Sequence, residues 1–322
     1  MISLNNKSVL VTGGAGFIGS HLVDRLILEK PSNIIVIDNL FLGKESNLNE
    51  ARQSSPIKFY RQDASDYVRM KEIVEAEDIQ VVFDLAVMPL MTSLERPRWT
   101  FEQNVNIVLC LCELARNGCF DTLIHFSSSE AYGSSQYVPM DENHPLNPTT
   151  PYGASKAATD LLILSYINTF GIDASIIRPF NNYGTRQNEG NYAGVIPLTI
   201  KRILQGKAPV IYGDGEQTRD FIYVTETANA TVEIYNHQST RGKIINIGSG
   251  SEITINELIR LITRYMNYKK AIKYENERLG EVRRLIANIN LAKEIIKFVP
   301  KISIEQEIKL TIDWYKNESC RT

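Results

Sequence analysis

The chain has 322 residues, of which 43% are hydrophobic and 22% are charged. These values are ordinary for globular proteins and allow a large core in one or two domains. The formal net charge of −2 excludes a global basic field of the kind that gathers nucleic acid or an anionic membrane surface. Any anionic ligand must therefore be held by local arginines and backbone amides.

Four cysteines lie at positions 110, 112, 119 and 320, without the spacing of metal ligands. We expect free thiols in a reducing compartment and no metal site. No apolar stretch is long enough to span a bilayer, and the first residues lack the pattern of a signal peptide. We therefore expect a cytoplasmic protein that binds neither nucleic acid nor a membrane.

Short apolar segments alternate with helix-length segments in the first half of the chain. The segments expected to be strands are 8–12, 33–37, 57–60, 80–85, 122–126 and 174–178. Segments with apolar residues at three-to-four spacing lie between most of them, for example at 17–29, 100–116 and 153–170. Nearly continuous apolar strands separated by helices predict an α/β fold with a Rossmann-type, doubly wound parallel sheet.

The pattern changes after residue 178. Residues 179–223 are rich in Gly, Pro, Asn and Arg, an apolar run follows at 244–248, and helices are expected near 254–267 and 303–316. We expect a smaller C-terminal α/β substrate lobe. The predicted division assigns 1–178 and about 220–250 to an NAD-binding Rossmann domain, and 179–219 and 251–322 to a nucleotide-sugar-binding lobe.

The first chemical motif is VTGGAGFIG, which follows a strand and opens a helix. Gly13 allows the tight turn, Gly16 lets the backbone approach a pyrophosphate, and Gly19 permits close helix–strand packing. The next strand ends at Asp38, whose carboxylate can accept hydrogen bonds from ribose hydroxyls and would repel a 2′-phosphate. Asp63 ends the following strand, where it could meet the adenine. Together these residues predict an NAD site rather than an NADP site.

The second motif is PYGASKAA, which places Tyr152 and Lys156 one helical turn apart. A tyrosine holds its proton well above neutral pH unless a nearby cation stabilises the phenolate. We expect the lysine, together with a positively charged nicotinamide ring, to make Tyr152 a usable base. The hydroxyls of residues 127–129 end a predicted strand, where such a base needs a partner for proton relay.

The motifs resemble those of the extended short-chain dehydrogenases that act on nucleotide sugars, the NAD-dependent epimerase/dehydratase family. The resemblance covers nearly the whole chain through TGGAGFIG, SSSEAYG, PYGASK, RPFNNYG, GDGEQTRDFIYV and INIGSG. It implies oxidation at sugar C4 by NAD, reaction of the 4-keto sugar, and return of the hydride. Tyr152 would be the C4 base, Lys156 its tuner and the anchor of the nicotinamide ribose, and Ser128 the hydroxyl that completes the relay.

The same resemblance implies a set of cofactor contacts and an assembly. The implied NAD-binding residues are Gly13, Gly16, Phe17, Ile18, Gly19, Asp38, Asn39, Asp63, Ala64, Leu85, Ala86, Asn104, Tyr152 and Lys156. Relatives pair through two helices per subunit, which implies a homodimer.

The later motifs suit a nucleoside diphosphate. Asn181 in RPFNNYG matches the pyrophosphate-contacting asparagine of the family, and Arg219 and Arg278 match arginines that clamp phosphates. A planar guanidinium suits this role because its fork binds two oxygens. UDP is the carrier that the family implies, although no residue here distinguishes uridine from thymidine or guanosine.

The reaction depends on the residues after the strand-end hydroxyl. The chain has Ser128, Ser129 and Glu130 where 4,6-dehydratases of the family carry Thr-Asp-Glu and simple 4-epimerases often lack the acid. The glutamate is present and the aspartic acid is not. This Ser-Glu pair resembles UDP-hexuronic acid decarboxylases and some dehydratases.

Decarboxylation is chemically consistent with these residues. A C4 ketone makes the C6 carboxylate a β-keto acid, whose carbon dioxide leaves as electrons flow into an enolate. Ser129 would orient the carboxylate, Glu130 would manage the C5 proton, and Arg186, Arg96 or Arg98 would bind the acid. The favoured hypothesis is therefore an NAD-dependent decarboxylase of UDP-glucuronate or UDP-N-acetylglucosaminuronate.

Other readings stay open. They are 4-epimerisation of UDP-glucose, UDP-N-acetylglucosamine or UDP-glucuronate, 4,6-dehydration, and a non-catalytic NAD-binding regulator. Glu130 could also cap the following turn or pair with an arginine. Two departures from the family weaken a substrate assignment: Asp84 stands where a histidine is usual, and MPLMTSLERP at 88–97 makes an unusual loop.

Overall fold

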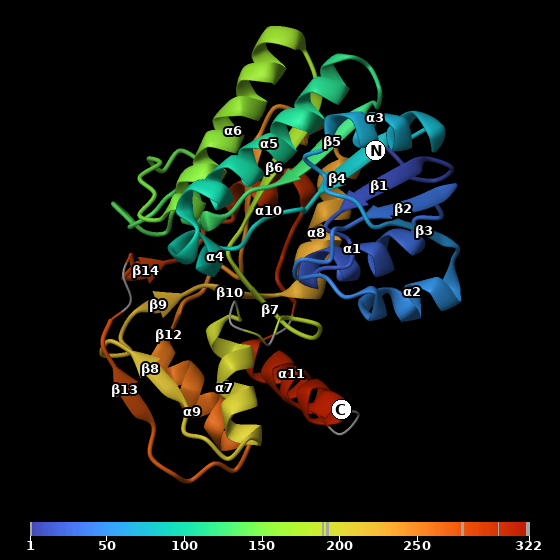
Figure 1. The fold of residues 1–322 in the computed structure, drawn as a ribbon. Coiled ribbons are helices and arrows are strands. Elements are labelled where there is room, and N and C mark those ends of the chain that lie inside the picture. Colours follow the sequence, from blue (N-terminus) through green and yellow to red (C-terminus); the bar gives the residue numbers. More distant parts are fainter. Residues whose placement is uncertain (1, 189, 191–192, 278–279, 302, 320–322) are drawn as a thin grey trace.

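The protein is described by a computed structural model that covers residues 2–188, 190, 193–277, 280–301 and 303–319. Its centre is a seven-stranded sheet with the strand order β11-β6-β5-β4-β1-β2-β3 (Figure 1). Every pairing in this sheet is parallel. The strands are β1 (Ser8–Thr12), β2 (Asn33–Ile37), β3 (Ile57–Tyr60), β4 (Val81–Asp84), β5 (Thr122–Phe126), β6 (Asp173–Pro179) and β11 (Ile244–Ile247). The predicted Rossmann-type fold is confirmed.

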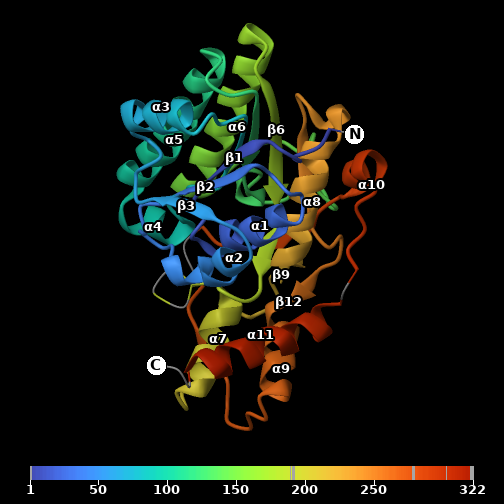
Figure 2. The ribbon, with the colours of Figure 1, turned by 90° about the vertical axis from the view of Figure 1, so that its right-hand side faces the viewer.

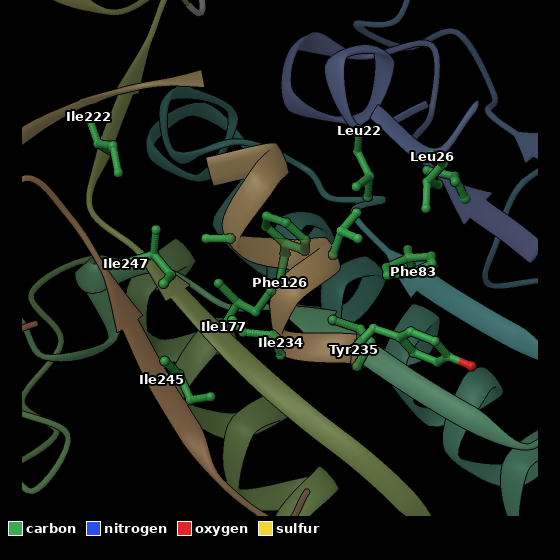
Figure 3. Packing of buried hydrophobic residues seen from close by; sticks show 14 of the residues in the cluster. Leu22, Leu26, Phe83, Phe126, Ile177, Ile222, Ile234, Tyr235, Ile245 and Ile247 are labelled. Carbon is green, nitrogen blue, oxygen red and sulfur yellow. The ribbon is translucent and has the colours of Figure 1, made fainter. Parts of the chain in front are cut away.

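Both faces of the sheet are covered, which explains why its strands are almost continuously apolar. The helices of this part are α1 (Phe17–Ile27), α2 (Asn49–Ser54), α3 (Tyr67–Ala76), α4 (Leu90–Glu95), α5 (Pro97–Arg116), α6 (Pro151–Phe170) and α8 (Val224–Asn236). Helices α1 and α8 cover one face, and α3, α5 and α6 cover the other (Figure 2). On the first face, Leu22 and Leu26 of α1 pack with Ile234 and Tyr235 of α8 and Phe83 of β4 (Figure 3).

The strand order predicts where a ligand would bind relative to the sheet. From β1 the chain runs outward through β2 and β3, then returns to β4 beside β1 and continues through β5 and β6. In open parallel sheets, ligands bind outside the carboxyl ends of the strands at the point where this direction reverses. Here that point lies between β1 and β4.

A smaller C-terminal lobe lies beyond the carboxyl ends of the strands (Figure 1). It contains short strands and three helices around a separate apolar core that includes Ile200, Leu258 and Ile312. Its elements are β7 (Asn181–Tyr183), α7 (Val195–Leu204), β8 (Val210–Tyr212), β9 (Thr218–Arg219), β10 (Phe221–Tyr223), β12 (Ile253–Thr254), α9 (Ile255–Tyr265), β13 (Lys273–Glu275), β14 (Arg284–Leu285) and α11 (Ile304–Ser319). The lobe is the predicted second unit of the fold.

The chain passes between the two units more than once. Strand β11 and helix α8 return to the large sheet and its covering layer, and we propose the division predicted above for this reason. Helix α10 (Asn290–Ile296) shows where the proposed boundary is less simple. Its Ala292 and Ile296 are buried in the core of the sheet domain rather than in that of the lobe.

Two expectations from the composition concern the cysteines and membrane-spanning segments. Cys110 and Cys112 are free and buried on α5, and Cys119 is free and partly buried. Cys320 lies outside the described residues. Within the described ranges, no helix combines the length and the apolar character that crossing a membrane requires.

Candidate active site

A cavity of about 660 Å³ lies between the carboxyl ends of the strands and the lobe. It brings together most of the residues predicted from the sequence. The predicted residues that line it are Gly13, Gly16, Phe17, Ile18, Gly19, Asp38, Asn39, Asp63, Ala64, Leu85, Ala86, Ser128, Glu130, Tyr152, Lys156, Asn181, Arg186 and Arg219. Asn104 and Ser129 are not among the lining residues, and Arg278 lies outside the described residues.

The glycine-rich turn joins β1 to α1 at the wall of this cavity. Gly13 has φ +65°, and a Cβ placed on it would lie 2.8 Å from the Ala86 backbone nitrogen. A Cβ on Gly19 would lie 2.2 Å from the Gly13 carbonyl oxygen. The turn therefore needs glycine both for its left-handed conformation and for close packing. It leaves the N-terminal end of α1 facing the cavity, where phosphate oxygens are favoured.

Two carboxylates follow the next two strands. Asp38 is buried and accepts hydrogen bonds from the backbone amides of Ala15 (3.0 Å) and Leu40 (2.8 Å). Burial raises the pKa of Asp38, and these amides act in the opposite direction. Asp63 accepts a hydrogen bond from the Ser65 backbone amide at 2.9 Å. This arrangement fits the adenosine half of NAD, because both acids line the cavity beside the glycine turn.

Asn104 does not line the cavity, and its predicted contact with NAD stays a prediction. It is buried in α5, where its amide nitrogen donates to the Ser155 hydroxyl (2.9 Å) and to the Met88 carbonyl (3.2 Å). Its amide oxygen accepts from the Met88 backbone amide at 2.7 Å. The side chain therefore fixes the loop after β4 against α6 and is not brought to the cavity.

The predicted Tyr–Lys pair lies in the first turns of α6. The helix begins after Thr150, whose hydroxyl accepts a hydrogen bond from the Gly153 amide, and Pro151 occupies the first helical position. Lys156 is buried and donates to the Phe126 carbonyl oxygen at 2.7 Å. Its ammonium group is thus fixed at the end of β5, beside the cavity.

Burial is the largest influence on the protonation of this pair. Burial raises the pKa of Tyr152 to about 12, and its hydrogen bond with Ser128 acts in the opposite direction. Lys156 is not one of the groups within the described chain that lower this pKa. Burial lowers the pKa of Lys156, and Asp84 and Asp160 oppose this change. Desolvation of the phenolate thus dominates in the protein alone, and acidification of Tyr152 by Lys156 together with a positively charged nicotinamide ring stays a prediction.

The serines and the glutamate lie at a short 3₁₀ turn, η2 (Ser129–Ala131). The Ser128 hydroxyl caps this turn by accepting from the Glu130 amide at 3.2 Å. Ser129 is buried beneath the turn. Burial raises the pKa of the Glu130 carboxyl, the Arg219 guanidinium lowers it, and Glu281 raises it. No hydrogen bond or ion pair joins the Glu130 side chain to another described residue, so neither the cap nor the arginine pair considered above is seen.

The arginines proposed for anionic groups are held by carboxylates. Arg219 forms an ion pair with Glu281, which also lines the cavity. Arg186 bridges Asp24 of α1 (2.6 Å) and Glu50 of α2 (2.8 Å). Both side chains remain at the cavity wall, so Arg219 could exchange its partner for a phosphate oxygen, whereas Arg186 joins the lobe to the sheet domain.

Two other arginines considered for a sugar carboxylate do not line the cavity. Arg96 lies over the Trp99 ring, and Arg98 is exposed and paired with Glu102. Asn181 does line it and donates to the Asp220 carbonyl at 3.3 Å. The loop at 88–97 thus presents apolar side chains to the cavity and directs these two arginines away from it.

The sequence reasoning missed much of the lobe wall. The missed lining residues include Asn182, Gln187, Asn188, Val195, Leu198, Thr199, Arg202, Val210, Tyr212, Gln217, Phe221 and Ile255. They belong to α7, to the first residue of α9, to the short strands of the lobe and to the connections around them. The density of Gly, Asn and Arg after residue 178 marked the region but could not select individual side chains. The apolar wall at 87–91 was noted only as an unusual loop.

Comparisons with known proteins agree with this geometry. The sequence profile of the NAD dependent epimerase/dehydratase family matches residues 9–248. A putative UDP-glucose 4-epimerase of Methanocaldococcus jannaschii is 37% identical, over 97% of this chain and 99% of the relative. A UDP-N-acetyl-alpha-D-glucosaminuronate decarboxylase of Bacillus cytotoxicus is 33% identical, over 96% of this chain and 98% of the relative.

A solved structure is also similar to this chain over almost its full length. The crystal structure of UDP-glucose 4-epimerase with UDP-glucose from Thermotoga maritima superposes with a TM-score of 0.91 at 33% identity, covering 97% of this chain and 99% of that one. The profile matches most of the chain, and the relatives align over almost its full length. The chain therefore belongs to the NAD dependent epimerase/dehydratase family and is an NAD-dependent enzyme that acts on nucleotide sugars.

Proposed function

We propose that the protein is a UDP-sugar 4-epimerase whose substrate is a neutral hexose or N-acetylhexosamine. The observation that carries the proposal is the electrostatic character of the cavity around Glu130. This carboxylate forms no ion pair with another described residue. Arg219 lowers its pKa but is itself paired with Glu281, and residues 87–91 line the same cavity with apolar side chains. A sugar with an anionic C6 group would add a second negative charge there, whereas a neutral sugar would not.

The positions of the arginines support the same choice. Arg96 and Arg98 do not line the cavity, and Arg186 is held by two carboxylates. Arg219 is paired with Glu281 and suits a phosphate. Arg202 of α7 also lines the cavity, and its Nε donates to the Ala208 carbonyl. None of the three arginines considered for a C6 carboxylate is thus free at the cavity wall. This argues against the favoured hypothesis of the sequence analysis, and the similarity to named 4-epimerases supports the alternative.

The chemistry assigned to the residues is a reversible proton transfer. NAD, when bound, accepts the hydride from sugar C4 and later returns it to the opposite face of the ring. Tyr152 takes the proton of the C4 hydroxyl, assisted by Ser128, and returns it when the ketone is reduced. Tyr152 must be a phenolate to take this proton. Because burial raises its pKa to about 12, we propose that the Lys156 ammonium stabilises that phenolate together with a positively charged nicotinamide ring. Lys156, fixed by the Phe126 carbonyl, orients the nicotinamide ribose.

The carrier and the assembly are part of the proposal. Arg219 and Asn181 line the cavity from the lobe, where a diphosphate could reach both. The similarity to enzymes of UDP-sugars supports UDP as the carrier. We further propose a homodimer formed through α5 and α6, and a cytoplasmic location.

Decarboxylation of a UDP-hexuronic acid is the second candidate. Burial raises the pKa of Glu130, so a protonated Glu130 could supply the C5 proton after loss of carbon dioxide. A named decarboxylase is 33% identical to this chain. Dehydration is less favoured, because Ser129 stands where an acid would protonate the departing C6 hydroxyl, and its side chain does not line the cavity.

Proton NMR of reaction mixtures tests the proposal. The substrates are UDP-glucose, UDP-N-acetylglucosamine, UDP-glucuronate and UDP-N-acetylglucosaminuronate, each with purified protein and NAD. We expect inversion at C4 of the neutral sugars, with C6 retained. Loss of the C6 carboxylate, or formation of a 6-deoxy-4-keto sugar, would instead identify the lyase reactions.

The Glu130→Gln variant gives a second, independent test. An epimerase should retain its turnover within a few fold, because C5 exchanges no proton in its cycle. A decarboxylase should lose on the order of 10²-fold or more. Glu77→Gln is the matched control, because that carboxylate is bound by Lys58 and Tyr60 and does not line the cavity.

A further inference from the structure

Asp84 is a buried carboxylate at the end of β4 whose hydrogen bonds join two neighbouring strands. One oxygen accepts from the Thr12 hydroxyl of β1 at 2.7 Å. The other lies 2.7 Å from Nδ1 of His125 on β5, and this nitrogen carries the proton because a carboxylate only accepts. Asp84 and His125 are 1% and 0% exposed. The family resemblance gave no role to this pair, since a histidine is usual at position 84.

One arm of the network leads to the catalytic helix. His125 Nε2 lies 3.5 Å from the Thr159 hydroxyl. This is a packing contact rather than a hydrogen bond, because Nε2 carries no proton when Nδ1 does and the Thr159 proton goes to Lys156. Thr159 in turn donates to the Lys156 backbone carbonyl at 2.9 Å, and the Lys156 ammonium donates to Phe126, the residue after His125. The side chain of Lys156 is thus hydrogen-bonded to the strand that carries His125, and Thr159, which is bonded to the Lys156 backbone, packs against the His125 ring.

The other arm leads to the cavity floor. The Thr12 hydroxyl accepts from the Leu85 and Ala86 backbone amides, each at 3.2 Å, while it donates to Asp84. Leu85 and Ala86 line the cavity and abut Gly13 of the glycine turn. Asp84 therefore connects the floor beneath the proposed NAD site with the helix that bears Lys156.

The charges around Lys156 distinguish Asp84 from the other nearby acid. Asp160 is the second carboxylate that acts on Lys156, but it forms a buried 2.8 Å ion pair with Arg178. Asp84 accepts from Thr12 and His125 and has no lysine or arginine partner in the described chain. Its charge is consequently the less compensated of the two.

We propose that Asp84 is a positioning residue for the epimerase reaction, which holds the Lys156 ammonium charged and in place through His125 and the adjoining Phe126 carbonyl at the end of β5. The inference rests on the proposed function, because it assumes that a charged Lys156 is needed for turnover. Burial lowers the pKa of Lys156, and Asp84 is the first of the groups that oppose this shift. The titratable groups around the ammonium are Asp84 of β4, His125 of β5, and Asp160 and Tyr152 of its own helix.

The Asp84→Asn variant tests the electrostatic part, because the amide is nearly isosteric and removes the charge. We expect the alkaline limb of the kcat–pH profile to move by about one unit or more toward lower pH, since Lys156 then loses its proton more easily. Asp173→Asn is the matched control: Asp173 also accepts from a neighbouring-strand threonine, Thr122, at 2.7 Å, but at the opposite end of the sheet. The alkaline limb of the kcat–pH profile of Asp173→Asn should not move.

Urea unfolding supplies a readout that needs no activity. In Asp84→Asn, a buried Lys156 without this counter-charge binds its proton more weakly in the folded than in the unfolded state, and this cost shrinks as pH approaches the pKa of an unfolded lysine. The decrease in urea midpoint relative to wild type should therefore shrink between pH 7 and pH 10. For Asp173→Asn it should stay constant, because the partner lost there, Arg241, keeps its charge throughout.

The outcomes separate the two proposals. If wild type inverts no UDP-sugar, the proposed function fails, and the unfolding comparison still decides the role of Asp84. An unmoved alkaline limb in Asp84→Asn, or a loss of stability that does not depend on pH, would overturn the positioning role. His125→Gln, which keeps the Asp84 charge, should lower kcat at least tenfold without moving the limb. An unchanged kcat would refute transmission through His125.

Discussion

Gly13→Ala probes the close contact between the glycine turn and the cavity floor. Gly13 has φ +65°, and a Cβ there would lie 2.8 Å from three backbone atoms, the Leu85 carbon and oxygen and the Ala86 nitrogen. Ordinary contacts begin at 3.4 Å, so the turn and the floor would have to separate by about 0.6 Å. Backbone on both sides leaves no flexible side chain to give way.

The loss of unfolding free energy in Gly13→Ala has two parts, which a second variant can separate. A left-handed alanine costs roughly 1–2 kcal/mol, and overpacking typically adds about 1–3 kcal/mol. Gly171→Ala should incur only the first part, because Gly171 has φ +71° and nothing lies within 4 Å of its added Cβ. Gly171 follows the last residue of α6, about 28 Å along the helix from its first turn, and so does not touch the cavity.

The assay combines urea unfolding with the amount of NAD bound by the purified protein. We expect Gly171→Ala to lose about 1–2 kcal/mol of unfolding free energy and keep its NAD, and Gly13→Ala to lose about 2–5 kcal/mol and at least tenfold in NAD affinity. Equal losses of stability with equal NAD content would refute the reasoning. They would mean that the floor moves freely and that only backbone strain matters.

Three further predictions concern buried ionisable groups. Tyr152→Phe should lower kcat by about 10²–10⁴-fold, with NAD content unchanged by absorbance; retained turnover would exclude it as the base. Asp160→Asn should cost about 3–5 kcal/mol in urea unfolding because it leaves Arg178 buried and unpaired, whereas the same change at the exposed Asp214 should have little effect. Burial raises the pKa of Glu307 from 4.5 to about 7, so the folded state binds the extra proton and stability should fall as pH rises from about 4.5 to about 7. Glu307→Gln should flatten this slope, and an unchanged slope would contradict the assignment.

The sheet was predictable because each of its strands is a local signal. Segments 8–12, 33–37, 57–60 and 122–126 agree with β1, β2, β3 and β5, since continuous apolar runs end at glycine or polar residues and need no partner to be recognised. The short strands of the lobe were not predictable. Strands of two or three residues carry no period and form only where another segment supplies their hydrogen bonds.

The site likewise has residues that local sequence patterns predict and residues whose contacts only the folded chain reveals. The glycine turn and the Tyr152–Lys156 spacing are written in consecutive residues, so the sequence placed them correctly at the cavity. The hydrogen bonds of Asn104 could not be predicted, because its partners Met88 and Ser155 come from other segments. Residues at 88–97 likewise looked unusual, and the direction of their side chains could not be inferred.

The sequence by itself determined the fold, the family and the position of the chemical groups, because these follow from short-range patterns of apolar, glycine and hydroxyl residues. Only the tertiary structure decided which charges are compensated. It paired Arg186 and Arg219 with carboxylates and left Glu130 without an ion pair among the described residues. It also buried Tyr152, which raises its pKa to about 12. Desolvation and ion pairing depend on neighbours far apart in the chain, and no local pattern records them.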